Sequence, residues 1–144
     1  MTCDDVITEI AAELNQFDDW EDRYAHIIAM GKKLEEYPKE HKKEDFLVSG
    51  CQSQVWLHPE FHDGKIHFDA DSDALVVKGL VAILMRIYNE RTPQEILAVP
   101  KDFISTLGLD THLSQNRANG LASMIKQVGL YAIAFSMKGS ASSV

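Results

Sequence analysis

Basic side chains are scarce in this sequence, which carries 14 Lys and Arg against 22 Asp and Glu and a net charge of −8. A protein that binds nucleic acid needs a basic face to displace the counterions of the phosphates. Anionic membrane surfaces attract clusters of Lys and Arg in the same way. The charge balance therefore argues against nucleic acid and anionic membranes as partners.

Long apolar runs and cysteines are also scarce. No segment reaches the roughly 20 consecutive apolar residues that a membrane-spanning helix needs. The acidic start, Met1–Asp5, lacks the charged and apolar regions of a signal peptide. The two cysteines, Cys3 and Cys51, are too few for the disulfide framework of a secreted protein. We therefore expect no membrane partner and a reducing, cytoplasmic location.

The rest of the composition is that of an ordinary globular domain. The chain has 144 residues, of which 45% are apolar and 25% are charged. Residues 1–144 should therefore form one domain with its own core. The small polar residues 139–144 should form a frayed tail.

Apolar residues recur at helical spacing through both ends of the chain. A first helix is predicted over 2–16, with a capping box at Thr2 and an exposed Cys3 in its first turn. A second helix is predicted to begin at Asp18. Gly31 lies inside that helix at a cost of about 1 kcal/mol relative to alanine. Close approach of another element would explain this glycine.

The later helices differ in how apolar they are. A third helix over 74–89, capped by Ser72 or Asp73, is apolar nearly all round, so we expect it to be the central core helix. Thr92 and the following proline predict a short helix. A long helix should then run from Leu113-Ser114 to about Met137.

A β-hairpin is predicted around Asp63-Gly64, a dipeptide favoured in two-residue turns. With that turn, residues whose numbers sum to 127 pair across the two strands. One face is then apolar and comprises Val55, Leu57, Pro59, Phe61, Ile66, Phe68 and Ala70. The other face is polar except for Trp56, so one side of the sheet should be covered. Pro59 lacks a backbone donor, which indicates an edge strand or a bulge.

Three histidines share the polar face of this hairpin: His58, His62 and His67. They suggest a zinc site, but His58 and His62 lie two alternations apart, roughly 13 Å. His62 also faces Lys65, which repels a cation. His41 stands alone in the charged segment 35–45, which we expect to be a solvated loop. We therefore expect no metal site.

The segment Ser49–Trp56 joins a glycine, a thiol and three polar side chains to the start of the first strand. Gly50 allows a bend that presents Cys51. A thiol is a nucleophile once it ionises, with a reference pKa of about 8.5. The alternative is a small buried apolar side chain, because free cysteines are often buried.

Arg117 is a further candidate, because a positive charge in the first turn of a helix opposes the helix dipole by about 0.3–1 kcal/mol. Pairing with a carboxylate or a thiolate would offset that cost. The sequence has no glycine-rich phosphate loop and no Ser-His-Asp motif. Helices flank a central hairpin without βαβ alternation, so the predicted class is α+β, with two or three antiparallel strands and helices on one face.

Several short motifs follow one another in a fixed order: Trp20-Glu21 with Tyr24, Ile28 and Gly31, Gly50–Trp56, Asp71–Ala74 with Val77–Leu80, Thr92–Ile96, and Leu113-Ser114 with Arg117 and Asn119–Leu121. On these motifs the chain resembles the SufE sulfur-acceptor family over about residues 10–137. The family's fold is α+β with an antiparallel sheet, in agreement with the pattern above. Cys3 and the histidines of the hairpin lie outside the resemblance.

The resemblance implies that Cys51 takes sulfur from a pyridoxal-phosphate-dependent cysteine desulfurase and carries it as a persulfide to an iron–sulfur scaffold. The carrier would also stimulate the desulfurase. It would be an accessory protein rather than a stand-alone enzyme, with no bound cofactor of its own. We expect Cys51 to rest partly covered by apolar side chains and to swing out on docking. Candidates for docking the partner or supporting the thiolate are Gly50, Gln52, Gln54, Asp73, Lys78 and Arg117.

Other functions remain open at this stage. A cysteine hydrolase would need a base within hydrogen-bond reach of Cys51, and no histidine can be placed there. An interaction module would keep an inert, buried Cys51. A sulfur carrier could also serve a pathway other than iron–sulfur assembly.

Overall fold

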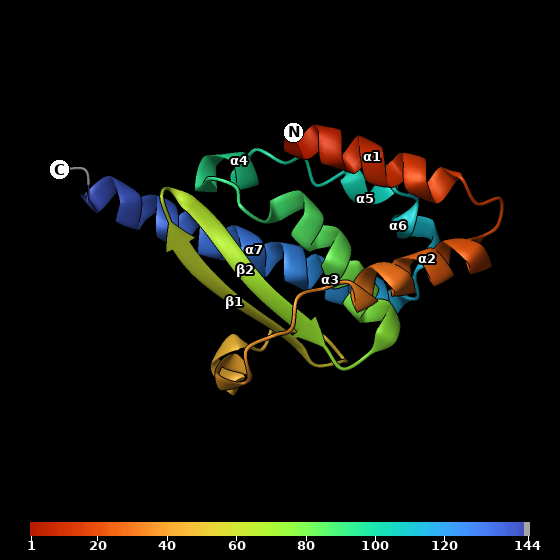
Figure 1. Cartoon of the computed structure of the whole chain (residues 1–144), viewed down its shortest axis with the longest axis horizontal. Helices are drawn as coiled ribbons and strands as arrows, with labels where there is room; N and C mark the ends of the chain where they lie inside the picture. Colours follow the sequence, from red (N-terminus) through yellow and green to blue (C-terminus); the bar gives the residue numbers. More distant parts are fainter. Residues whose placement is uncertain (143–144) are drawn as a thin grey trace.

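The computed structural model describes the backbone of residues 1–142 and the side chains of residues 1–137. Its elements follow one another along the chain as α1 (Cys3–Asn15), α2 (Trp20–Lys32), the 3₁₀ turns η1 (Lys39–His41) and η2 (Glu44–Phe46), β1 (Val55–His62), β2 (Lys65–Ser72), α3 (Leu75–Tyr88), α4 (Pro93–Leu97), α5 (Phe103–Thr106), α6 (Leu109–His112) and α7 (Gln115–Ser142). Figure 1 shows the hairpin lying along α3 and α7.

The hairpin has the predicted turn and register. Asp63 and Gly64 both have positive φ, at 52° and 81°, and every strand pair from Val55↔Ser72 to His62↔Lys65 sums to 127. Both strands of this two-stranded sheet are edges. Pro59, which has no backbone N–H to donate, therefore fits in β1 without a bulge.

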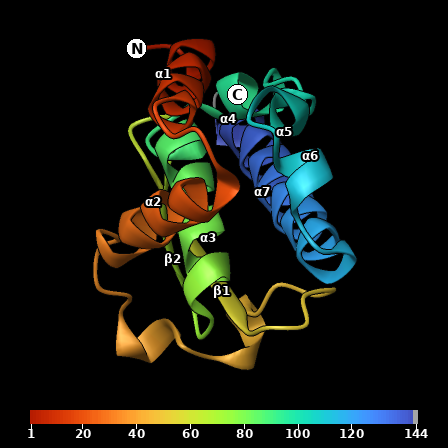
Figure 2. The same cartoon turned by 90° about the vertical axis from the view of Figure 1, so that its right-hand side faces the viewer.

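The apolar face of the sheet packs against α3 and α7. Leu57, Ile66 and Phe68 are buried there, and Phe61 stacks on Phe135 of α7 with ring centroids 5.2 Å apart. Figure 2 shows α3 between α2 and α7, with the strands behind α3. The predicted α+β class and the buried central helix are confirmed.

Helices α2 and α3 cross at two glycines. A Cβ on Gly79 would lie 2.3 Å from the carbonyl oxygen of Ile27, and one on Gly31 would lie 2.8 Å from the Gly79 nitrogen. Only hydrogen atoms fit between backbones this close. The close approach predicted for Gly31 is confirmed.

Two predicted helix starts are wrong by one or two residues. The second helix is capped by Asp19, which accepts from the Asp22 nitrogen at 2.9 Å, because Asp18 and Asp19 offer equivalent caps in sequence. The third helix has Ala74 at its N-cap, with no side-chain cap. Asp73 instead accepts a hydrogen bond from the Gln54 nitrogen at 3.1 Å, so tertiary structure takes the expected cap.

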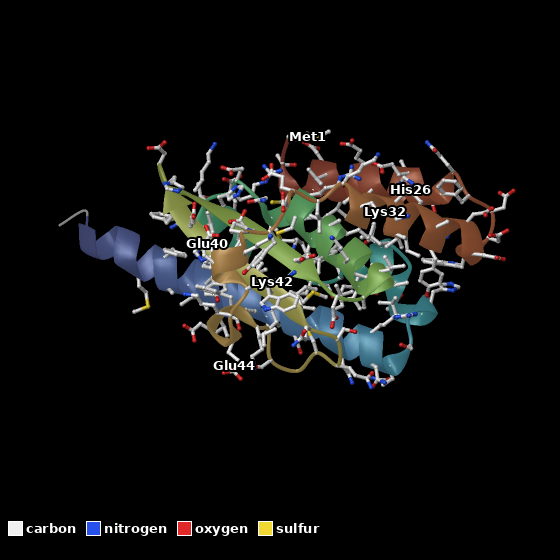
Figure 3. The ribbon with its side chains drawn as sticks, turned by 60° about the horizontal axis from the view of Figure 1, so that its bottom comes forward. Met1, His26, Lys32, Glu40, Lys42 and Glu44 are labelled. Carbon is white, nitrogen blue, oxygen red and sulfur yellow. The ribbon has the colours of Figure 1, made fainter. Side chains whose placement is uncertain are left out.

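Residues 35–45 are mostly exposed, as predicted, but this segment covers part of the polar face of the sheet. Tyr37 is buried, and His41 stacks on His58 with ring centroids 3.6 Å apart. Trp56 is also buried, with Lys42 Nζ 4.9 Å from its ring centroid. Figure 3 shows this segment, marked by Glu40, Lys42 and Glu44, in front of the hairpin. Aromatic stacking and cation–π contact replace the apolar periodicity that the sequence lacks.

Helix α7 extends to Ser142 rather than ending near Met137. Extending an existing helix fixes one residue at a time, so small polar residues can continue it. Of the predicted tail 139–144, residues 143 and 144 lie outside the described residues. No run of roughly 20 consecutive apolar residues occurs, as expected, but Gln115–Met137 is long and apolar enough to cross a membrane by length and composition alone. Its Leu121 and Val128 belong to the buried core.

Cys3 is buried, not exposed as predicted. It is 9% exposed, and its thiol donates to the Ile87 carbonyl oxygen at 3.4 Å. The capping box at Thr2 is present as expected. The box begins α1 at Cys3, which lies on the face of α1 toward α3.

Candidate functional site

Cys51 lies in a short loop whose two ends are held together. At the start of the loop, the Val48 nitrogen donates to the Val55 carbonyl oxygen at 2.9 Å. At its end, the Gln54 carbonyl oxygen accepts from Ser72 Oγ at 2.9 Å. Residues 49–54 therefore project from a fixed base and carry Cys51 in the middle.

Gly50 determines the conformation of this loop. Its φ is +87°, in the left-handed region that side-chain-bearing residues rarely adopt. A Cβ there would also lie 2.5 Å from Ser123 Oγ of α7. The positive φ favours glycine, and a larger residue would also force the Ser123 side chain to turn away, so Gly50 positions the next residue, Cys51, against α7.

The Cys51 side chain is half-buried between the loop and α7. Its thiol donates to the Gly120 carbonyl oxygen over 3.6 Å, and a Cβ on Gly120 would lie 3.7 Å from the sulfur. In Figure 2 the yellow loop reaches toward the first turns of α7. Burial raises the pKa of the Cys51 thiol above its ordinary value, so at neutral pH the resting residue is a thiol.

The thiol opens on a cavity of about 560 Å³ between the loop, the start of α3 and the start of α7. The cavity is lined by Cys51, Gln52, Ser53, Ala74, Leu75, Val76, Val77, Leu80, Ser114, Asn116, Arg117, Gly120 and Met124. Among these lining residues, Arg117 alone carries a charge. Leu75 at the rim is 64% exposed, a large apolar side chain in solvent beside the thiol. The site thus combines a shielded thiol, one cation and an exposed apolar contact.

The residues that the sequence singled out fall into four groups, of which three lie at the loop and its cavity. Gln52 and Arg117 line the cavity with Cys51, whereas Gly50 shapes the loop from outside it. Gln54 and Asp73 exchange hydrogen bonds at the base of the loop.

Lys78 is not among the cavity residues. Its Nζ lies 3.2 Å from Asp71 Oδ1, and Lys42 Nζ lies at the same distance from Asp71 Oδ2. The carboxylate of Asp71 thus holds both lysines at the sheet, so Lys78 gives no direct support to a Cys51 thiolate.

Sequence reasoning identified Arg117 of α7 but missed the other groups that α7 contributes to the site. Ser123 and Met124 carry no chemical signal in the sequence, although Asn119–Leu121 belongs to the motifs described above. The Gly120 carbonyl oxygen is a backbone group, and its role depends on a contact 69 positions from Cys51.

The lining residues limit the chemistry of the site. No histidine, aspartate or glutamate lines the cavity, within the residues that the structure describes. A hydrolase has no general base there, and a metal ion would find a single thiol as its ligand. Transfer of a group between thiols needs only the thiol, access and a partner.

Comparisons with known proteins identify the family of this chain. The family described as "SufE: Fe-S metabolism associated domain" matches residues 8–132. An "uncharacterized SufE-like protein" of Rhizobium meliloti (strain 1021) is 40% identical over 127 residues, covering 85% of this chain and 91% of the relative. One of Synechocystis sp. (strain ATCC 27184 / PCC 6803 / Kazusa) is 39% identical over 131 residues, covering 91% of this chain and 82% of the relative.

The fold also has a solved counterpart. The solution structure of a hypothetical protein from Thermus thermophilus matches with a TM-score of 0.74 at 19% identity, covering 90% of this chain and 94% of the other. The matched domain connects the chain to sulfur transfer in iron–sulfur metabolism. By this domain match and by both relatives, the chain belongs to the SufE family.

Proposed function

We propose that this protein is a sulfur carrier whose Cys51 accepts sulfur from a cysteine desulfurase. The observation that carries the proposal is the half-buried Cys51 thiol, on a loop held at both ends, facing a cavity large enough for an added sulfur atom. The carrier delivers the sulfur to an iron–sulfur scaffold and stimulates the desulfurase. It binds no cofactor of its own, because the pyridoxal phosphate belongs to the desulfurase, and it works in the reducing cytoplasm.

The transfer step is a thiol exchange. The Cys51 thiolate attacks the outer sulfur of the persulfide on the desulfurase cysteine. A new sulfur–sulfur bond forms at Cys51 as the donor's sulfur–sulfur bond breaks, and the donor cysteine leaves as a thiolate with that electron pair. The proton lost by Cys51 balances the one that the donor gains, and no net oxidation occurs.

Burial connects reactivity to docking. In the resting protein, burial raises the pKa of Cys51 and keeps the weakly nucleophilic thiol form. Moving Cys51 out of the cavity into the partner's site removes the burial that raises its pKa, and this favours the thiolate. Gln52, Arg117 and the exposed Leu75 surround the thiol, so they form the docking face around it. Gln54 and Asp73 hold the base on which the loop moves.

The test is sulfur transfer from a cognate desulfurase supplied with labelled cysteine and pyridoxal phosphate. Wild type, Cys51→Ser and Cys3→Ser are compared by non-reducing gel and intact mass. We expect label on wild type and Cys3→Ser, and none on Cys51→Ser. No label on wild type beside an active desulfurase would favour an interaction module with an inert cysteine. Label passed to an acceptor other than an iron–sulfur scaffold would assign the carrier to another sulfur pathway.

A further inference from the structure

The polar face of the hairpin carries titratable side chains that sulfur transfer does not use. We define the histidine face as His58, Glu60, His62, His67 and Asp69 together with His41 and Glu35, which the chain before the hairpin brings next to it. It is the sheet face opposite α3 and α7. The segment 37–48 that covers part of it is seen in Figure 3.

Three of these side chains offer ligand atoms at one point. One atom each from Glu35, His67 and Asp69 lies within 4.8 Å of the other two. His67 Nε2 and Asp69 Oδ1 are 3.3 Å apart. Ligands at about 2.0–2.2 Å around a tetrahedral cation are separated by about this distance. His67 and Asp69 are two positions apart on β2, so the strand itself points both to one side.

Glu90 holds the His67 ring for such a role. Its Oε1 lies 2.5 Å from His67 Nδ1, and its backbone nitrogen donates to the Ile66 carbonyl oxygen at 2.9 Å. A carboxylate that accepts a hydrogen bond from Nδ1 keeps the ring proton on that nitrogen and leaves Nε2 free for a cation. Metal-bound histidines are usually held by such a hydrogen bond.

His58 provides an independent indication of an incomplete site. It is 9% exposed, and its buried Nδ1 has no hydrogen-bond partner among the residues that the structure describes. Asp69 Oδ2 lies 3.7 Å from this nitrogen. Stacking on His41 keeps the His58 ring beside Asp69. A small shift of Asp69 on binding a cation with Oδ1 would let Oδ2 accept from His58, and that hydrogen bond would hold the carboxylate in its ligating orientation.

Two of the three ligand residues, Glu35 and Asp69, border a cavity. The cavity has a volume of about 500 Å³ and is enclosed by α2, α3 and β2, with Met30, Phe68 and Met85 in its wall. Of the two basic residues in that wall, Lys33 and Arg86, the second is neutralised by Glu13 through bonds of 2.9 and 2.6 Å. The cavity lies beside Glu35 and Asp69, so water or a small molecule can reach a cation held there.

We propose that Glu35, His67 and Asp69 bind one first-row divalent cation of the Zn²⁺ class, with Glu90 positioning His67. The histidine spacing on the hairpin argued against a metal because it compared His58, His62 and His67 with one another. The other two ligands are carboxylates, Glu35 from the segment that follows α2 and Asp69 from β2 itself. The alternative is that no cation binds and that His67 is an imidazolium held between the carboxylates of Glu90 and Asp69. The test must distinguish this arrangement from a bound cation.

The test is isothermal titration of Zn²⁺ into the metal-free full chain. Cys51→Ser serves as the background, because exposed thiols bind zinc. We expect one Zn²⁺ per chain, with affinity at least tenfold lower in His67→Gln and in Glu35→Gln. Glu35 is exposed, so its substitution leaves the fold intact, which circular dichroism verifies. Glu90→Gln should lower the affinity about tenfold or more, as loss of the group that orients a metal-bound histidine does.

The matched control is His62→Gln. His62 lies on the same face but pairs with Glu60, at 3.2 Å, outside the three ligands, and its substitution should leave the affinity unchanged. The proposal is overturned if the background protein shows no saturable Zn²⁺ binding, as the imidazolium alternative requires. It is also overturned if His67→Gln binds as tightly as the background. Loss of binding in His41→Gln alone would overturn it too, because His41, His58 and Glu60 form a second group whose ligand atoms lie within 4.8 Å of one another. Unchanged affinity in Glu90→Gln would remove the positioning role of Glu90.

Discussion

The two cysteines of this chain are both covered, but their surroundings differ. Cys3 belongs to the packed core where α1 meets α3 and bonds to the Ile87 carbonyl oxygen. Cys51 bonds to the Gly120 carbonyl oxygen on a projecting loop beside a cavity of about 560 Å³. Burial raises the pKa of both thiols, so ionisation alone does not separate them. The difference lies in how much of the structure must move to expose each sulfur.

The largest expected contrast is in alkylation rate. Exposing Cys3 requires opening of the helical core, whereas exposing Cys51 requires movement of one loop, and local opening costs far less than global opening. We expect iodoacetamide to modify Cys51 at least about 100-fold faster than Cys3, measured by peptide mass spectrometry over time. Adding the desulfurase should accelerate Cys51 alone. Equal rates for the two thiols, or a Cys51 rate that the partner leaves unchanged, would remove the distinction.

The rigidity of the core around Cys3 is tested at the α2–α3 crossing. Gly79→Ala places a Cβ 2.3 Å from the Ile27 carbonyl oxygen, so the helices must separate. We expect a loss of about 2–3 kcal/mol in the free energy of unfolding, measured with urea. Gly129→Ala is the matched control, because a Cβ there meets nothing within 4 Å and alanine favours the helix by about 1 kcal/mol. Similar effects of the two substitutions would show that the crossing is loosely packed.

The Cys51 loop is tested with a second pair of glycines. Gly50 and Gly64 have similar φ, +87° and +81°, so alanine at either should cost about 1–2 kcal/mol of backbone strain. Only at Gly50 does the new Cβ also meet a side chain, Ser123 Oγ at 2.5 Å. Gly50→Ala should therefore displace the loop and speed alkylation of Cys51 without changing that of Cys3, whereas Gly64→Ala should change neither. A Gly50→Ala protein with the wild-type Cys51 rate would show that Gly50 does not position the thiol.

The smallest expected effect is in pH dependence. A thiol whose pKa is raised by folding stabilises the fold fully below the pKa of the unfolded chain, about 8.5. That contribution is lost as the pH rises through the higher value of the folded state. The alkylation rate of Cys51 in the resting protein should accordingly reach half its maximum above the pH found for the unfolded chain. A midpoint at or below that of the unfolded chain would mean that a positive charge, such as Arg117, outweighs burial.

Local features of the sequence predicted much of this fold. Asp63-Gly64 and strict alternation determine the register of the hairpin, because a turn and a period of two leave one pairing. Capping boxes at Thr2 and Thr92 mark two helix starts, and both are present. Cys51 and its loop were visible as a motif in one short stretch.

The missed features depend on contacts between distant segments. The Cys3–Ile87 bond spans 84 positions, so helical periodicity could not show that Cys3 is buried. The stacking of His41 on His58 brings a charged segment onto the sheet, although that segment has no apolar pattern. Placement of Arg117 beside Cys51 likewise follows from the packing of α7, not from spacing.

The assignment of Cys51 as the sulfur acceptor is best tested by comparing both cysteines in a single unmodified molecule. Wild-type protein is loaded by the desulfurase, its sulfur atoms are trapped by alkylation, and the digested peptides that contain Cys3 and Cys51 are quantified by mass spectrometry. We expect an added sulfur atom on the Cys51 peptide and none on the Cys3 peptide. Added sulfur on Cys3, or equally on both, would contradict the assignment of Cys51 as the acceptor.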